Sequence, residues 1–408
     1  MNQRQTQHKL LIFNEQVHQA ILKIVQKHLP LEISARDLDD KKLWEIVCHA
    51  SVEQGYIESS CRVLQDAPSG NTVRAHLIEA LGDGDQAINQ LEEELNRALQ
   101  AQMPQAVRRK LRSRAWEAAG DWVDIPYYGK DGEENQNVRP SRPKTGTSRF
   151  HPYATLAVIH KGKRVTLALT VVHKGEKMDQ IVKRLIARAR ELGARFKCTY
   201  WDKAFGAVEV MRHLRACRVP YVIALAQHGE NGIRRLCAGR RSLRARYAFN
   251  TKKKAPPYET DVAIACHYAG RTSKRRPKKK KKGVRYYAYA VYGVGGRGAQ
   301  AISAAYRRRF SIESGYRQLH QVRARTRSRH TGLRLLLIGL ALLLVNLYVL
   351  LRASWSLVTH YGSRICRRAV TLNEVATALL MQIQSLLGFS PEFHCRAQTW
   401  YSVNFVIY

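Results

Sequence analysis

The feature that most constrains the fold of this chain is the order of strand-like and helix-like segments between residues 115 and 226. A short, weakly apolar stretch ends at Asp121, and two longer strand patterns follow it, joined by a basic, hairpin-like connection. Helical and strand patterns then alternate. The segments after Asp121 are strands over 151–160 and 163–172, a helix over 178–193, a strand over 196–201, a helix over 204–217 and a strand over 219–226.

Three strands followed by helix, strand, helix and strand form the element order of a ribonuclease H-like fold. We therefore expect an α/β protein with a mixed sheet flanked by helices. Residues 229–300 interrupt this order with a segment rich in Lys, Arg and Tyr that carries short strand patterns. We interpret this segment as a basic, β-rich insertion within one catalytic domain.

Residues 1 to about 110 carry apolar positions at spacings of three and four, which predicts a separate helical domain at the N-terminus. Residues 66–70 break the pattern, and Asn71 or Thr72 can cap a new helix. Two helices joined by a tight turn, the second carrying Arg74, suit a helix-turn-helix that reads DNA. An ordinary helical hairpin has the same pattern and is the alternative.

These patterns together predict five segments. The order is a helical DNA-binding domain (1–112), the first part of the catalytic domain (113–228), the β-rich insertion (229–300), the second part of the catalytic domain (301–352) and a C-terminal helical region (353–408). The tail after the last amphipathic helix, at 372–387, carries no pattern that predicts a structure.

The charge of the chain points to a polyanionic partner. Lys and Arg number 69 against 32 Asp and Glu, a formal net charge of +37. Basic side chains that neutralise phosphates release condensed counterions, so nucleic acid is the expected partner, in a ribosomal or architectural protein as much as in an enzyme. The polybasic run 271–285 contains Lys278, Lys279 and Lys280, and Tyr286 after it adds a stacking surface that favours contact with a DNA strand over a merely solvated face.

Residues 335–351 form an apolar stretch at the lower length limit of a membrane span. The polar Asn346 within it and the strongly basic surroundings favour a fully buried helix in a large core instead, so we expect no membrane association. The N-terminus lacks the apolar core of a secretory signal, and the eight dispersed cysteines form no CxxC pair. We therefore expect a cytoplasmic, nucleoid-associated protein without a zinc knuckle or a disulfide framework.

Acidic residues are scarce in this basic chain, so their positions carry information about chemistry. Asp202 directly follows the strand at 196–201, at the carboxyl end where open α/β sheets bind ligands; a helix N-cap is its alternative role. Asp121 and Asp124 both lie near the end of the first strand, and spacing alone does not choose between them.

A third acid, Glu313, lies in a strongly helical segment. Offsets of minus seven, minus four and plus four place Tyr306, Arg309 and Arg317 on its helix face. Surface ion pairs are one interpretation of this face. The other is a cleft in which the arginines bind DNA phosphates while the glutamate binds a metal ion, because phosphoryl transfer on DNA requires divalent ions held by hard oxygen ligands.

Together these residues resemble the DDE transposases of prokaryotic insertion sequences, in the superfamily marked by the signature Tyr-x2-Arg-x3-Glu-x6-Lys. The resemblance covers residues 115 to about 350. Tyr306, Arg309 and Glu313 stand at the required spacings, and WDKAFGAVEVMRHL is similar to the second-aspartate motif. DWVDIPYYGK is similar to the block in which the first aspartate precedes a Pro-Tyr pair by five residues, which selects Asp121. Residues 146–169 and the apolar helix are similar to the halophile-type branch.

The resemblance implies a site in which Asp121, Asp202 and Glu313 are catalytic and bind Mg²⁺ or Mn²⁺. It also implies double-stranded DNA partners, namely terminal inverted repeats and target DNA, together with a homodimeric synaptic complex and cut-and-paste transposition. Tyr306 and Arg309 would then position the scissile phosphate.

The chain departs from the family pattern at two places. His320 stands where the signature has Lys, so Arg317 or Arg323 is expected to supply that phosphate contact. Some relatives hold a flipped base with a Trp of the insertion, but this chain has no Trp between Trp201 and Trp355, which leaves Tyr286 to stack there. The alternative function is a non-catalytic DNA-binding protein derived from a transposase, which would bind DNA without nicking it.

Overall fold

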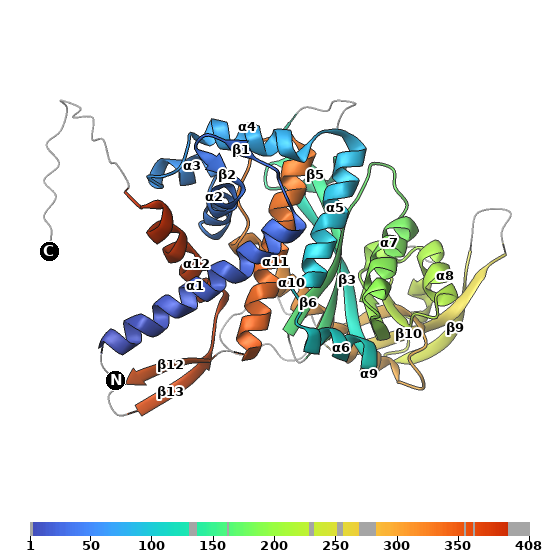
Figure 1. Ribbon diagram of the computed structural model, residues 1–408. Coiled ribbons are helices and arrows are strands. Elements are labelled where there is room, and N and C mark those ends of the chain that lie inside the picture. The colour runs from blue at the N-terminus through green and yellow to red at the C-terminus, as the bar shows by residue number, and fades with distance from the viewer. Residues whose placement is uncertain are drawn as a thin grey trace, which may run out of the picture.

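The computed structural model describes residues 3–129, 137–160, 163–227, 232–250, 256–268, 283–354, 356–361 and 364–390 (Figure 1). Within these ranges, the side chains of 3–12, 34, 160, 310–314, 356–361 and 364–367 are outside the description.

The helices are α1 (Gln3–His28), α2 (Asp40–Val52), α3 (Ile57–Val63), α4 (Gly70–Leu81), α5 (Gly84–Ala101), α6 (Gln105–Ser113), α7 (Met178–Glu191), α8 (Val208–Ala216), α9 (Ala299–Tyr306), α10 (Ser311–Gln321), α11 (Thr331–Ser354) and α12 (Leu372–Leu387), with 3-10 turns η1 (Lys203–Phe205), η2 (Ile233–Leu236) and η3 (Arg307–Phe310). The strands are β1 (Ser34–Ala35), β2 (Leu38–Asp39), β3 (Ala115–Pro126), β4 (Arg139–Lys144), β5 (Thr147–His160), β6 (Lys163–Val171), β7 (Arg195–Trp201), β8 (Tyr221–Ala224), β9 (Leu243–Phe249), β10 (Tyr258–Tyr268), β11 (Val284–Tyr292), β12 (Ser356–Tyr361) and β13 (Arg364–Ala369).

A nine-stranded mixed sheet forms the centre of the molecule. Strand β3 pairs antiparallel with β5, which pairs with β6, and parallel with β7, which is parallel to β8. Parallel neighbours require a crossover, and α7 and α8 provide the crossovers before β7 and β8. The resulting order β6-β5-β3-β7-β8 confirms the predicted ribonuclease H-like arrangement.

The predicted insertion is rich in strands, and these strands extend the central sheet. Strand β11 pairs antiparallel with β8, β10 pairs with β11, and β9 pairs with β10. The insertion therefore contributes to the same sheet as β3, β5, β6, β7 and β8. The boundaries of the five predicted segments remain predictions.

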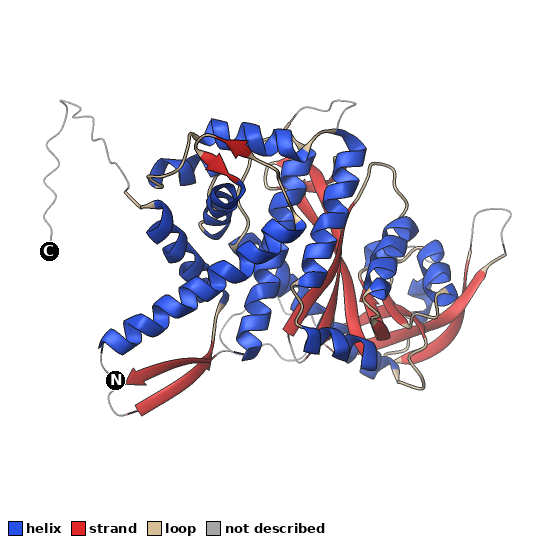
Figure 2. Ribbon diagram, in the orientation of Figure 1, coloured by secondary structure: helices blue, strands red, loops and turns tan. Residues whose placement is uncertain are grey.

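Helices lie on both sides of the sheet (Figure 2). Alternate residues of β3 point to opposite faces, so Ala118 packs in the cluster with α7 and α8, whereas Ala119 packs with α9. Val123, which shares the face of Ala119, joins the core that contains α11. Asp121 lies between Ala119 and Val123 on this second face.

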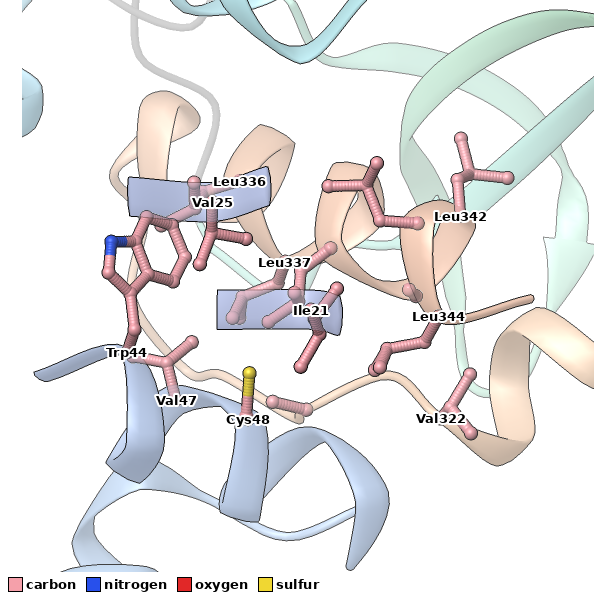
Figure 3. Close-up of a cluster of buried hydrophobic side chains, with 14 of the residues drawn as sticks. Ile21, Val25, Trp44, Val47, Cys48, Val322, Leu336, Leu337, Leu342 and Leu344 are labelled. Atoms are coloured by element: carbon pink, nitrogen blue, oxygen red, sulfur yellow. The ribbon is translucent and has the colours of Figure 1, made fainter. Parts of the chain in front are cut away.

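The N-terminal helices pack against α11 in one shared core. Figure 3 shows side chains of α1 and α2, among them Ile21, Val25 and Trp44, close to Leu336 and Leu337 of α11. The prediction of a helical N-terminus is confirmed, but these helices do not stand apart as a separate module, because their apolar faces are buried against the helix that follows the catalytic segment.

Helix α11 is the predicted apolar helix. It is long and apolar enough to cross a membrane, yet 89% of its most apolar window is buried inside the protein. Asn346, near its middle, accepts a hydrogen bond from the backbone nitrogen of Thr166 at 2.9 Å and donates one to the Thr166 carbonyl at 3.0 Å. The Asn346 side chain thus forms hydrogen bonds with the backbone of the sheet, as a polar group in a buried helix requires.

Candidate active site

Asp121 lies within β3, on the face covered by α9, α10 and α11. Its side chain is buried, and its partner residue across the antiparallel pair with β5 is Thr155. The prediction that the first strand ends at Asp121 is wrong, because residues 122–126 continue to pair with β5 as far as Pro126.

Asp202 directly follows β7, as predicted. Gly120 and Trp201 are partners in the parallel pair of β3 with β7, so Asp121 and Asp202 are the next residues along two neighbouring strands. Gly120 makes this close approach possible: a Cβ atom there would lie 1.9 Å from the Trp201 ring. The local packing therefore brings two carboxylates, 81 positions apart in the chain, to the same place on the sheet.

The Asp202 carboxylate has two partners. One oxygen, Oδ1, accepts a hydrogen bond from the backbone nitrogen of Ala204 and caps the 3-10 turn η1. The other oxygen, Oδ2, faces Arg309. The helix predicted over 204–217 is divided into η1 and α8. Asp202 caps η1 with one carboxylate oxygen and faces Arg309 with the other, so it combines helix capping with a contact in the site.

Arg309 joins the two carboxylates. Its Nη2 atom lies 3.3 Å from Oδ1 of Asp121 and 3.5 Å from Oδ2 of Asp202, and its side chain is buried. These two oxygens are therefore no more than about 6.8 Å apart, the sum of the two distances. A guanidinium at this position partly balances two negative charges that would otherwise repel each other.

Burial dominates the ionisation of Asp121. Desolvation raises the pKa of Asp121 to about 6, although Arg309, a hydrogen bond from the backbone of Trp122 and the more distant Arg164 favour the charged form. The negative charge of Asp202 raises this pKa further. A carboxylate whose pKa lies this close to neutral pH is typical of functional sites, where burial and neighbouring charges shift the pKa of acidic residues.

Tyr306 anchors the end of β7. Its hydroxyl donates a hydrogen bond to the carbonyl oxygen of Trp201 at 3.2 Å, and its ring packs edge-on against Tyr200 and tilted against Tyr289. Burial raises the pKa of Tyr306 above its usual value, so the hydroxyl is neutral. The side chain thereby fixes the backbone immediately before Asp202.

The segment that carries Tyr306, Arg309 and Glu313 differs from the single helix expected. Helix α9 ends at Tyr306, η3 follows, and α10 begins at Ser311. Glu313 lies in the first turn of α10, and its side chain is outside the described residues.

One turn after Glu313, Tyr316 contacts the strand next to Asp121. The Tyr316 hydroxyl lies 3.0 Å from Oγ1 of Thr155, the strand partner of Asp121. The Tyr316 side chain therefore fixes this part of α10 against β5. Among the side chains described, no group of three or more metal-binding residues is found.

Arg164 is a site residue that the sequence patterns missed. It is buried on β6, with its guanidinium 5.8 Å from the centre of the Tyr316 ring. A Cβ atom at Gly315 would lie 1.7 Å from its Cζ, so only glycine leaves room for it. Burial lowers the pKa of Arg164, whereas Tyr316 and Asp121 oppose that shift. In the sequence, Arg164 lies at the start of an apolar strand pattern, where a charged side chain is usually exposed to solvent. The pattern therefore does not mark it as a site residue.

Asp124, the alternative first carboxylate, lies elsewhere. It accepts a short hydrogen bond from the Trp122 indole at 2.5 Å, and Lys144 Nζ is 3.8 Å away. Asp124 is three positions after Asp121, an odd number, so the two side chains point to opposite faces of β3. The geometry therefore agrees with the selection of Asp121.

The other residues predicted to bind DNA are divided between α10 and distant parts of the chain. The side chains of Arg317 and His320 are exposed on α10, although partial desolvation by the surrounding protein and the nearby charge of Arg323 lower the pKa of His320. Arg323 is half-buried just beyond α10. Tyr286 is half-buried on β11, and its hydroxyl accepts a hydrogen bond from the backbone of Arg240. Lys278, Lys279 and Lys280 lie outside the described residues.

The predicted helix-turn-helix has a different cap from the one expected. Ser69, rather than Asn71 or Thr72, caps α4 by accepting a hydrogen bond from the Thr72 backbone. Arg74 forms an ion pair with Glu58 of α3 at 3.0 Å and donates to the Asn71 side chain. Arg74 therefore fixes α4 to α3 in this structure, and a role in reading DNA remains a prediction.

Comparison with known proteins agrees with this geometry. The family model of the transposase DDE domain matches residues 117–347. A solved structure, titled as a synaptic complex of piggyBac transposase with hairpin DNA, aligns with a TM-score of 0.50 and 9% identity, covering 92% of this chain and 79% of that one; this likeness concerns the fold alone. No curated protein matches the chain. Because the matched family region spans more than half of the sequence and includes Asp121, Asp202 and Glu313, the protein belongs to the DDE-domain transposases.

Proposed function

We propose that the protein is an active cut-and-paste transposase that cleaves double-stranded DNA at the terminal inverted repeats of an insertion sequence and joins the ends to target DNA. The observation that carries this proposal is the convergence of Asp121 and Asp202 on the single guanidinium of Arg309. A buried carboxylate beside a second, half-buried carboxylate on the neighbouring strand end is costly to keep for structural reasons alone.

The donor set fits Mg²⁺ or Mn²⁺. Asp121 and Asp202 offer hard oxygen ligands close together, and α10, the helix whose sequence contains Glu313, is held against β5 by the Tyr316–Thr155 hydrogen bond. No sulfur ligand faces the two carboxylates among the described contacts. Two bound divalent ions would activate the attacking water or 3′-hydroxyl and stabilise the leaving oxygen.

The residues of the chain have distinct roles in this proposal. Asp121 must lose its proton before it can act as a ligand, and Arg309 is expected to exchange its carboxylate partners for an oxygen of the scissile phosphate. Tyr306 holds the backbone before Asp202, and the Thr155–Tyr316 hydrogen bond holds α10 against β5. Tyr306 is therefore a positioning residue in this account, whereas the signature alone suggested contact with the phosphate.

Partners and assembly follow from the same proposal. The aligned piggyBac structure is a transposase bound to DNA, which supports duplex DNA as the partner of this chain, as does the net charge of +37. We propose a homodimer in the synaptic complex and a cytoplasmic, nucleoid-associated protein.

The test is metal-dependent cleavage of a linear DNA that carries the gene with its native flanks. We expect the purified protein to cut at the element ends in Mg²⁺, and D121N, D202N and E313Q to lose at least about a thousandfold in rate because each removes a ligand. D124N is the matched control, since it removes an acid of the same strand that faces away from Arg309.

Wild-type cleavage in D202N or E313Q would refute the mechanism. Salt-sensitive binding by the wild-type protein without any nicking in Mg²⁺ or Mn²⁺ would favour the non-catalytic DNA-binding protein instead.

A further inference from the structure

The connection between α10 and α11 carries arginines at every second position, Arg323, Arg325, Arg327 and Arg329. Burial alternates with the same period: Val322 and Ala324 are buried in the core shared with α11, whereas the last three arginines are exposed. In extended backbone, alternate residues lie about 6–7 Å apart on one side. The three exposed side chains therefore alternate with less exposed residues along the connection, and we call them the arginine row (Arg325, Arg327 and Arg329).

The N-terminal helices hold the arginine row in place. The backbone nitrogen of Arg325 donates to the carbonyl of Gly55, between α2 and α3, at 2.7 Å. The guanidinium of Arg327 lies over the ring of Tyr56, 5.7 Å from its centre. At the end of the connection, Nε2 of His330 lies 2.9 Å from Oδ1 of Asp83, between α4 and α5. A row fixed before it meets a ligand loses little conformational entropy on binding.

In the part of the chain that the structure describes, no acidic side chain balances these arginines. Among the described residues, none of the arginines from Arg323 to Arg329 forms an ion pair with a carboxylate, and Asp83 pairs with His330 instead. Arg334, close by in α11, is buried, and its guanidinium donates hydrogen bonds to the carbonyl oxygens of Ser328 and Pro126. The electrostatic field of this region therefore favours an external anion.

We propose that the arginine row binds consecutive phosphates of duplex DNA between the catalytic carboxylates and the N-terminal helices. The row begins a few residues after α10, which carries Glu313 and Arg317, and ends against the turns of the N-terminal helices. Alternate residues of an extended backbone are about 6–7 Å apart, which lets long arginine side chains reach successive phosphates of one DNA strand. Tyr56, the aromatic ring beside the row, is covered by Arg327, which suits contact with a backbone and not base stacking. The identity of the partner rests on the proposed function.

The salt dependence of binding tests this surface without requiring cleavage. The probe is a fluorescein-labelled duplex of mixed sequence, about 40 base pairs long, titrated with the full chain in EDTA at several KCl concentrations. The variant R325Q/R327Q/R329Q is compared with R109Q/K110Q/R195Q, which removes three exposed charges at the opposite ends of β3 and β7. R325K/R327K/R329K keeps the charge.

We expect the slope of log affinity against log salt to be smaller by about 2 to 3 in the arginine-row glutamine variant, because each lost phosphate contact removes about 0.9. The control and the lysine variant should keep the wild-type slope within about one. Equal slopes for the wild-type protein and the arginine-row glutamine variant, or equal losses in both glutamine variants, would overturn the proposal. D202N should bind with the wild-type slope, so a failure of catalysis and a failure of the arginine row give different results.

Discussion

At the level of single residues, the proposed chemistry depends on the ionisation of Asp121. Burial raises its pKa to about 6, and Arg309 only partly compensates. A protonated Asp121 cannot act as a metal ligand, so proton and metal compete for the same oxygen atoms. Asp121 lies within β3 and not at the end of the strand, so its side chain is buried. Burial raises its pKa, and protons therefore compete with the metal ion.

We therefore expect cleavage to depend on pH near 6. Below that pH the logarithm of the single-turnover rate should rise by about one per pH unit, and it should level off above it. Increasing Mn²⁺ should move the midpoint to lower pH, because bound metal favours the ionised carboxylate. D124N should show the same profile. A rate that is constant from pH 5 to 8, or a midpoint that ignores the metal concentration, would contradict this role for Asp121.

The same shift predicts that Asp121 destabilises the metal-free protein at neutral pH. The native state binds more protons than the unfolded state between pH 4 and 6, so stability falls as pH rises through this window. D121N should therefore raise Tm by a few degrees at pH 7 in EDTA, while Arg309 keeps its contact with Asp202. Mn²⁺ should raise Tm of the wild-type protein but not of D121N. If D121N lowers Tm in EDTA, Asp121 is a stabilising residue and this interpretation of its burial is wrong.

At the level of elements, side chains from two helices seal the outer edge of β6. Asn346 of α11 pairs with Thr166, and Asn96 of α5 accepts from the backbone nitrogen of Leu169 and donates to its carbonyl, both at 2.8 Å. Glu92 accepts from the backbone nitrogen of Val171. A register shift opposite 156–157 explains why the outward groups change from residue 166 to 169 and 171. These contacts replace a neighbouring strand and prevent edge pairing with another chain.

N96A tests the importance of this edge. The substitution leaves the buried N–H of Leu169 without a partner, whereas the Leu169 carbonyl keeps its hydrogen bond from Arg188. An unpaired buried N–H costs about 1–3 kcal/mol, so the free energy of unfolding should fall by about that amount in urea. N89A is the matched control, because Asn89 is exposed on the same helix. Equal stability of N96A and N89A would show that water replaces Asn96 without loss.

The sequence predicts the elements better than the contacts between them. Alternation of apolar residues identifies β5 to β8, and Asn346 marks α11 as a buried helix. The break at η3 is not visible in propensities, because it depends on long-range partners. Arg307 contacts His267, Arg308 pairs with Glu117 and Arg309 pairs with Asp121, so three successive arginines reach two strands. The full length of β3 likewise depends on pairing with β5.

At the level of the whole molecule, the N-terminal helices and the catalytic sheet share one core through α11. If the helices bind DNA as proposed, they will present it to the carboxylates as part of one continuous body rather than as a loosely linked module. The net charge of +37 makes two free chains repel each other, and bound DNA removes this repulsion.

We accordingly expect assembly to depend on DNA. Light scattering at moderate salt should give the mass of one chain for the free protein and two chains per complex when duplexes that carry the element ends are added. High salt should dissolve the complex, since phosphate contacts are lost. A stable dimer without DNA would show that protein surfaces alone drive assembly, and a complex with one chain would exclude a dimeric synapse.

The position of bound Mn²⁺ in crystals of the wild-type protein tests the central claim most directly. Anomalous scattering should show a peak within about 2–2.5 Å of carboxylate oxygens of both Asp121 and Asp202, with Glu313 beside it and Arg309 moved away from at least one carboxylate. A map in which Mn²⁺ binds only elsewhere, while Arg309 still joins Asp121 to Asp202, would contradict the account.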